Sequence, residues 1–134
     1  MVNVKYLAYS TVLIECVNHD GAHGSGTGFF VELEPNKETH APMLVLVTNK
    51  HVVDTAKSLK LVFTVGAGGE PTDKTYSVSL DGFRPLWRFH PDANVDLCAL
   101  QLSVVLSMAH RKGIELMISP FSVQQIAFKD DFQK

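Results

Sequence analysis

The sequence contains no long hydrophobic run. None of its apolar stretches approaches the roughly 20 residues that a membrane-spanning helix requires. The N-terminal stretch MVNVKYLAYS also lacks the apolar core and the small-residue cleavage site of a signal peptide. We therefore expect a cytoplasmic protein that does not use a membrane as a partner.

Charge and cysteine are scarce as well. Charged residues make up 19% of the 134 positions, the formal net charge is -2, and no basic stripe occurs, which argues against nucleic acid as a partner. The two cysteines, Cys16 and Cys98, each lie inside an apolar run, so we expect buried free thiols and no disulfide. Hydrophobic residues make up 46% of the chain, which is enough for one domain with a core of its own.

The part of the chain before residue 103 shows the pattern of short strands separated by turns. The strand-like segments are apolar or alternate between apolar and polar residues, and the predicted strands are 10–17, 27–34, 42–48, 58–65, 75–83, 84–90 and 96–102. Segment 42–48 is apolar at consecutive positions, which is typical of a strand covered on both faces. Segment 66–74 (GAGGEPTDK) is the strongest turn signal. Six or seven strands at this spacing indicate either a small β-barrel or a β-sandwich.

The pattern changes to that of a helix after residue 103. Val105, Met108 and Ala109 fall at positions i, i+3 and i+4, two basic residues occupy the last turn, and Gly113 follows. This arrangement predicts a short helix with a stop signal. The last stretch, 122–134 (SVQQIAFKDDFQK), is mixed, and a strand, a short helix and a linker all fit its sequence.

Three segments each carry one distinctive feature. Segment 24–31 (GSGTGFFV) is a glycine-rich strand, segment 46–54 (LVTNKHVVD) has a histidine after a strand, and segment 90–102 (HPDANVDLCALQL) has an aspartate before a strand. In this order they resemble the N-terminal half of a trypsin-like serine protease of the chymotrypsin fold, closest to bacterial and phage trypsin-like peptidases. In that family a strand ending in Thr-x-x-His precedes an Asp-Leu-x-x-Leu strand. The motif Gly-x-Ser-Gly-Gly comes later.

The resemblance implies an all-β fold, namely a six- to seven-stranded Greek-key β-barrel with a short C-terminal helix. Residues 1–103 would form the N-terminal barrel, and residues 104–134 the helix and an inter-barrel connection, with the second barrel absent. The resemblance also implies that His51 is the general base and that Asp96 orients it. A serine hydroxyl needs such a base, and a carboxylate on the other ring nitrogen fixes the tautomer. The family needs no metal and no organic cofactor.

Other candidate residues have simpler interpretations. His90 is interpreted as a loop residue and not as an alternative base. His19 and His23 flank a glycine-rich loop without cysteine or acidic partners at ligand spacing, so we expect no zinc site there. Cys98 lies two positions after Asp96, which places both side chains on one face of a strand. A functional thiol is one reading of Cys98, and a buried filler is the favoured one.

The family's nucleophile motif does not occur in this sequence. No serine lies in Gly-x-Ser-Gly-Gly, and Ser25, in GSGTG, precedes the histidine, so it is rejected as the nucleophile. After Asp96 only 134 − 96 = 38 residues remain, too few for a second barrel with its oxyanion hole and specificity pocket. We expect this chain alone to be inactive and to be the N-terminal part of a longer enzyme. A gene that ends at Lys134 is the alternative.

The resulting prediction is the N-terminal domain of a trypsin-like serine endopeptidase that acts on protein or peptide substrates. The alternative is a non-catalytic protein-binding β-barrel, either a pseudoprotease or a site that another chain completes. A third hypothesis is an unrelated small β-barrel in which His51 and Asp96 never meet. The predicted partner is the missing C-terminal barrel with its serine. Because a solitary first barrel would expose its apolar inter-barrel face, homodimerisation through that face is also expected.

Overall fold

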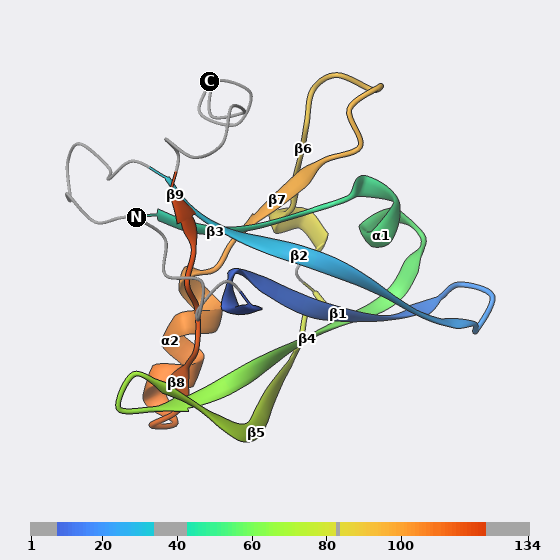
Figure 1. Cartoon of the computed structure of the whole chain (residues 1–134). Coiled ribbons are helices and arrows are strands. Elements are labelled where there is room, and N and C mark those ends of the chain that lie inside the picture. The colour runs from blue at the N-terminus through green and yellow to red at the C-terminus, as the bar shows by residue number, and fades with distance from the viewer. Residues whose placement is uncertain (1–7, 34–42, 83, 123–134) are drawn as a thin grey trace.

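One β-sheet organises the described part of the chain, which comprises residues 8–33, 43–82 and 84–122 of a computed structural model (Figure 1). Two α-helices, α1 and α2, and a 3-10 helix, η2, accompany the sheet. In chain order the elements are β1 (Thr11–Asn18), β2 (His23–Leu33), β3 (Met43–Thr48), α1 (Lys50–Asp54), β4 (Ala56–Ala67), β5 (Glu70–Ser79), η2 (Arg84–Leu86), β6 (Arg88–Phe89), β7 (Cys98–Gln101), α2 (Ser103–Arg111), β8 (Glu115–Leu116) and β9 (Phe121–Ser122).

The strands follow the order β5-β4-β1-β2-β3-β7-β6 across the sheet. β8 pairs with β4 and β9 pairs with β2, and the β2–β9 pair is parallel while the others are antiparallel. Among the described residues the sheet does not close, because β5 and β6 remain its two ends. The chain is therefore mostly β, as its strand pattern predicts. Within the same residues, no helix has the length and apolar character that crossing a bilayer requires.

The number and bounds of the strands differ from the prediction in three places. The described sheet has nine strands and not six or seven, because β8 and β9 arise from the segment predicted as a connection. Segment 84–90 is mostly η2, with only the two-residue strand β6. Segment 66–74 is not a loop. Its turn is confined to Gly68 and Gly69, whose φ angles of 61° and 82° suit a two-residue hairpin turn, so β4 and β5 extend almost to it.

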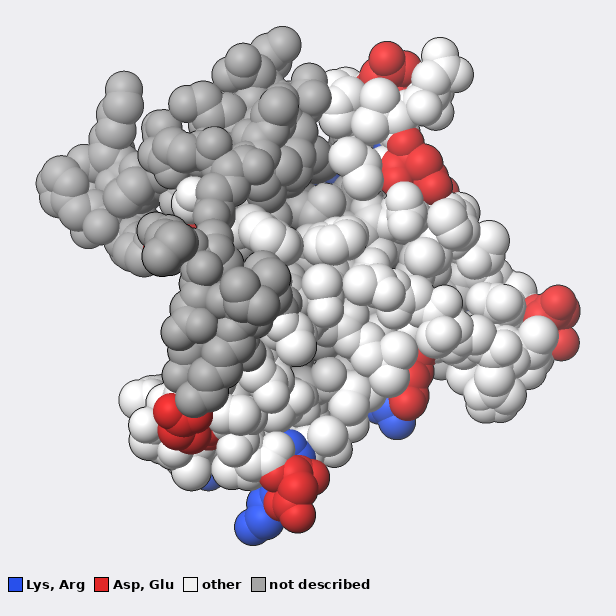
Figure 2. Space-filling view, in the orientation of Figure 1, with Lys and Arg blue, Asp and Glu red and all other residues white. Residues whose placement is uncertain are grey.

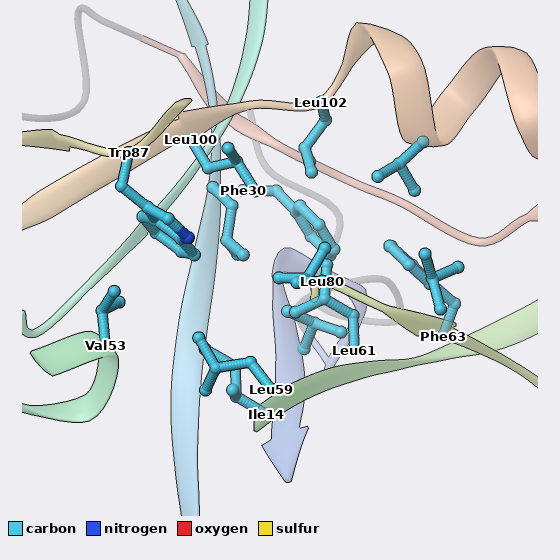
Figure 3. Close-up of a cluster of buried hydrophobic side chains, with 14 of the residues drawn as sticks. Ile14, Phe30, Val53, Leu59, Leu61, Phe63, Leu80, Trp87, Leu100 and Leu102 are labelled. Atoms are coloured by element: carbon cyan, nitrogen blue, oxygen red, sulfur yellow. The ribbon is translucent and has the colours of Figure 1, made fainter. Parts of the chain in front are cut away.

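Two hydrophobic clusters lie on opposite faces of the sheet. Figure 3 shows the larger one, the main core, in which Phe30 stacks on Phe63 with ring centroids 5.9 Å apart. The smaller cluster comprises Val31, Leu33, Val45, Val47 and Ala99. Strand β3 alternates between them, since Leu46 belongs to the main core and its two neighbours to the other cluster. This confirms that β3 is covered on both faces and explains why its sequence shows no period of two.

The helix after residue 103 and the state of the cysteines agree with the sequence. In α2, Val105 and Ala109 are buried, and Gly113 follows the helix with a φ of 70°, a conformation that glycine adopts without strain. Cys16 and Cys98 are both buried and free, as predicted.

Candidate active site

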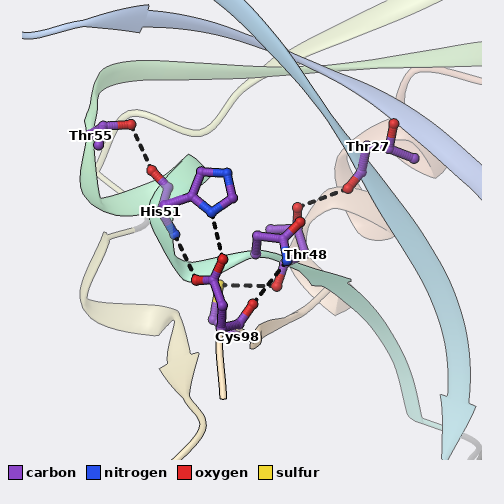
Figure 4. A network of polar contacts seen from close by, with 7 residues as sticks. Thr27, Thr48, His51, Thr55 and Cys98 are labelled. Atoms are coloured by element: carbon purple, nitrogen blue, oxygen red, sulfur yellow. Dashed lines mark hydrogen bonds and ion pairs between the residues drawn. The ribbon is translucent and has the colours of Figure 1, made fainter. Parts of the chain in front are cut away.

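His51 and Asp96 meet through two hydrogen bonds (Figure 4). The Nδ1 atom of His51 lies 2.5 Å from Oδ2 of Asp96, and the backbone N–H of His51 donates to Oδ1 at 3.1 Å. One carboxylate thus contacts both the ring and the backbone of the same residue, which restricts the rotation of the imidazole. The third hypothesis, in which the two side chains never meet, is wrong.

The register of two neighbouring strands brings these residues together. β3 and β7 are antiparallel, and Thr48, the last residue of β3, pairs with Cys98, the first residue of β7. The C-terminal end of one strand and the N-terminal end of the other therefore lie at the same edge of the sheet. His51 follows Thr48 by three positions and Asp96 precedes Cys98 by two, so two residues 45 positions apart in the sequence lie within hydrogen-bond distance.

The helix that carries His51 is held at its N-terminal end by the segment before β7. The side-chain amide of Asn49 donates to the backbone carbonyl of Asp96 at 3.0 Å, and the Lys50 ammonium donates to the carbonyl of Asp92 at 3.0 Å. At the C-terminal end of the helix, the hydroxyl of Thr55, the C-cap residue, donates to the carbonyl of His51 at 2.6 Å. Because α1 has only five residues, these contacts and not helix propensity keep it formed.

Strand β2 provides the surface on which this site rests. The Thr48 side chain, 2% exposed, donates to the carbonyl of Thr27 at 2.8 Å. Gly26 faces the main core, since it pairs with the buried Ile14, and a Cβ atom at that position would lie 3.0 Å from Cγ2 of Val52. The glycine therefore lets α1 approach β2 closely.

The electrostatics of the pair favour an ionised aspartate and a defined tautomer of the histidine. The hydrogen bond from the His51 ring holds the pKa of Asp96 below its ordinary 3.8, although partial desolvation opposes this shift. An ionised carboxylate only accepts hydrogen bonds, so a neutral His51 ring carries its proton on Nδ1 and leaves Nε2 as an acceptor. The His51 side chain is 68% exposed and that of Asp96 47%, so a reaction partner can reach the ring. The arrangement can accept a proton at Nε2.

Cys98 is a buried free thiol, in keeping with the favoured interpretation of this residue. Its Sγ lies 3.7 Å from the carbonyl of Thr48, and it is fully buried. Burial, with a contribution from the carboxylates of Asp54 and Asp96, raises the pKa of Cys98 to about 12. A thiol with that pKa stays protonated and unreactive at neutral pH.

The remaining candidates lie outside the pair. His90 is buried between β6 and the following loop, and its Nδ1 accepts a hydrogen bond from the backbone N–H of Asp92 at 3.0 Å. Ser25 pairs with Glu15 on the face of β2 opposite to the glycines. His19 lies in the turn before β2, which begins at His23. In the part of the chain that the structure describes, no group of three potential ligand side chains is placed to hold a metal ion.

Sequence reasoning missed one residue that contacts the histidine-bearing helix. Arg84 donates from Nη1 to the carbonyl of Val53 at 3.1 Å and from Nη2 to the carboxylate of Asp54 at 2.6 Å. Nothing in RPLWRFH distinguishes this arginine from a surface residue, because its partners lie about 30 positions earlier.

Comparisons of this chain with family models, curated proteins and solved structures give no match.

Proposed function

We propose that this chain supplies the histidine base and the orienting aspartate of a trypsin-like serine endopeptidase. The observation that carries the proposal is the contact of Asp96 with both the ring and the backbone of His51. A carboxylate on Nδ1 is the arrangement that keeps Nε2 available as a general base and stabilises the imidazolium that forms after proton transfer.

The proposed reaction needs a serine that is not among the candidates in this sequence. The serine Oγ attacks the peptide carbonyl carbon while its proton moves to Nε2 of His51. The imidazolium then returns that proton to the nitrogen of the leaving amine, and the C–N bond breaks to leave an acyl-enzyme. Water hydrolyses the acyl-enzyme by the same proton route. The serine and its oxyanion hole would come from a second barrel, on the same polypeptide or on another chain.

The proposal includes a Greek-key β-barrel as the first barrel of the enzyme. This part of the proposal is supported by the spatial order β4-β1-β2-β3, because a Greek key has three consecutive strands side by side and a fourth that returns beside the first. Its support also includes the main core, to which β1, β2, β3, β4, β5 and β7 all contribute.

The test is to find the serine by its chemistry. The protein is tagged at its chromosomal gene, purified from its source cells and treated with a fluorophosphonate, which forms a covalent bond with an activated serine. We expect one labelled serine in the purified protein or complex, and strongly reduced labelling in His51→Ala. In Asp96→Asn, peptide hydrolysis should fall by about 10⁴-fold, because the wrong tautomer removes the base. Labelling that persists unchanged in His51→Ala would refute the proposal.

A second candidate function, a protein-binding module, is favoured by the exposed apolar side chains on the sheet. Leu13 and Phe29, on the neighbouring strands β1 and β2, are each 45% exposed. Figure 2 shows few charged side chains on the surface over these two strands. Such a surface suits a protein contact, either with a second barrel or with another copy of the chain. A protein that binds partners tightly, carries no labelled serine and is insensitive to His51→Ala would favour this function.

A further inference from the structure

Arg84 connects the segment that carries His51 to the segment that leads to Asp96. Its two hydrogen bonds reach the last turn of α1, at the carbonyl of Val53 and the carboxylate of Asp54. Its guanidinium also lies over the ring of Phe89, with Cζ 5.4 Å from the ring centroid.

The aromatic contact extends this connection to the aspartate. Phe89, in β6, pairs with Cys98, the first residue of β7, and the next residue, His90, donates from its backbone N–H to the carbonyl of Leu97 at 2.9 Å. Asp96 directly precedes Leu97. Arg84 is therefore in contact with α1 on one side and with the strand that pairs beside Asp96 on the other.

In the His51–Asp96 dyad, the bonds from Asn49 and Lys50 hold only the N-terminal end of α1, which leaves its C-terminal end to another contact. The two side chains of the dyad are 68% and 47% exposed, and exposed ion pairs contribute little to holding two segments in one geometry. Helix α1 is a single turn with no side-chain cap at its N-terminus. A guanidinium that binds a carbonyl and a carboxylate at its C-terminal end offsets both the unsatisfied carbonyl and the negative end of the helix dipole.

We propose that Arg84 is a positioning residue that holds the His51 imidazole on Asp96. This inference rests on the proposed function for the role of His51, but the geometry it concerns is measurable in the 134-residue chain without any serine. Arg84 reaches the dyad through its bonds to Val53 and Asp54, so its effect on the imidazole passes through α1.

The experiment follows the Nδ1 proton of His51 by NMR in the full 134-residue chain labelled with ¹⁵N. The rate at which this proton exchanges with water reports how firmly the ring is held on the carboxylate. In Arg84→Met we expect exchange to be about five- to tenfold faster, because both hydrogen bonds from this side chain to α1 are lost. Arg84→Lys keeps the charge but has one nitrogen for two acceptors, so its rate should be intermediate.

Two matched variants separate positioning from a general loss of stability. Arg88→Met removes an exposed arginine four positions away in β6. Lys112→Met removes a cation that lies 5.5 Å from the ring centroid of Tyr76, at the end of α2 and not at the dyad. Both should keep the wild-type exchange rate, while urea unfolding measures any change in global stability. If Arg84→Met does not fold, Asp54→Ala removes one of the two acceptors and leaves the bond from Arg84 to the Val53 carbonyl.

An exchange rate in Arg84→Met equal to that of the wild type would overturn the inference, as would an equal acceleration in Lys112→Met. A dyad proton that depends on Arg84, in a protein whose serines take no fluorophosphonate label, would leave the inference standing and refute the endopeptidase. If a serine takes the fluorophosphonate label only when His51 is present, and the exchange rate of the Nδ1 proton does not change in Arg84→Met, only the inference would be refuted. A wild-type ring without a proton on Nδ1 would overturn both.

Discussion

The glycines of β2 provide a quantitative test of how the sheet positions α1. Gly24, Gly26 and Gly28 all face the main core, because their partners on β1 are the buried Cys16, Ile14 and Val12. A Cβ atom at 24 would meet nothing within 4 Å, whereas one at 26 would lie 3.0 Å from Val52. At 28 it would overlap the Leu46 side chain, which is fully buried. The same glycine-to-alanine substitution at these three positions therefore places a methyl group in three different environments: open space, a tight contact and an overlap.

The expected stabilities follow from these spaces. Gly24→Ala should be neutral or stabilising by up to about 1 kcal/mol, because alanine lowers the entropy of the unfolded chain. Gly28→Ala should destabilise by about 1–2 kcal/mol, since overpacking in a buried site costs about 1–3 kcal/mol and exceeds that gain. Gly26→Ala should lie between them, because Val52 is only partly buried and can shift by a few tenths of an ångström.

The assay is urea unfolding followed by the fluorescence of Trp87, the only tryptophan, which is buried in the main core. With an m-value of about 1–3 kcal/mol/M, a difference of about 2 kcal/mol separates the midpoints of Gly24→Ala and Gly28→Ala by about 1 M. Leu46→Ala alone should cost about 2–5 kcal/mol. In the double variant with Gly28→Ala the new methyl enters the vacated space, so the total should fall short of the sum by about 0.5–3 kcal/mol.

Two results would refute this reasoning. One is a Gly28→Ala protein as stable as Gly24→Ala, and the other is strict additivity of Gly28→Ala and Leu46→Ala. Either result would mean that the packing of the Leu46 side chain against β2 does not depend on the absence of a side chain at Gly28.

Three further predictions concern the thiols, the acid dependence of the dyad and the exposed face. Neither Cys16 nor Cys98 should react with a disulfide reagent at neutral pH in the folded protein, since burial raises both pKa values, and both should react after unfolding in urea; fast labelling of the native protein would contradict this. Because the folded pKa of Asp96 lies below its ordinary 3.8, its contribution to stability is present above that pH and disappears as the pH falls through the lowered value. The stability difference between wild type and Asp96→Asn, from urea unfolding across acidic pH, should therefore shrink towards low pH, and a constant difference would contradict the assignment. Phe29→Ser should reduce self-association in light scattering, whereas a wild type that is monomeric at all concentrations would argue against the exposed face as a contact surface.

Local patterns were enough to predict the longer strands and the helix. β1, β3, β4 and α2 follow from runs of apolar residues and from turn residues, because a strand or helix of several residues imposes its period on the sequence. The two-residue strands β8 and β9 show no such period, and the strand predicted over 84–90 is reduced to the two residues of β6. The turn predicted in segment 66–74 occupies only Gly68 and Gly69, because two residues with positive φ are enough for a tight turn.

His51 and Asp96 were each recognisable from neighbouring residues, as a histidine after an apolar strand and an aspartate before one. Whether they meet depends on the pairing of Thr48 with Cys98, and a register is a property of two strands together, not of either one. The same holds for Arg84, whose partners are backbone and side-chain atoms of a helix about 30 residues away. The sequence alone therefore identifies the candidate residues. The distance between His51 and Asp96 is decided only by the tertiary structure, because it depends on how β3 and β7 pair.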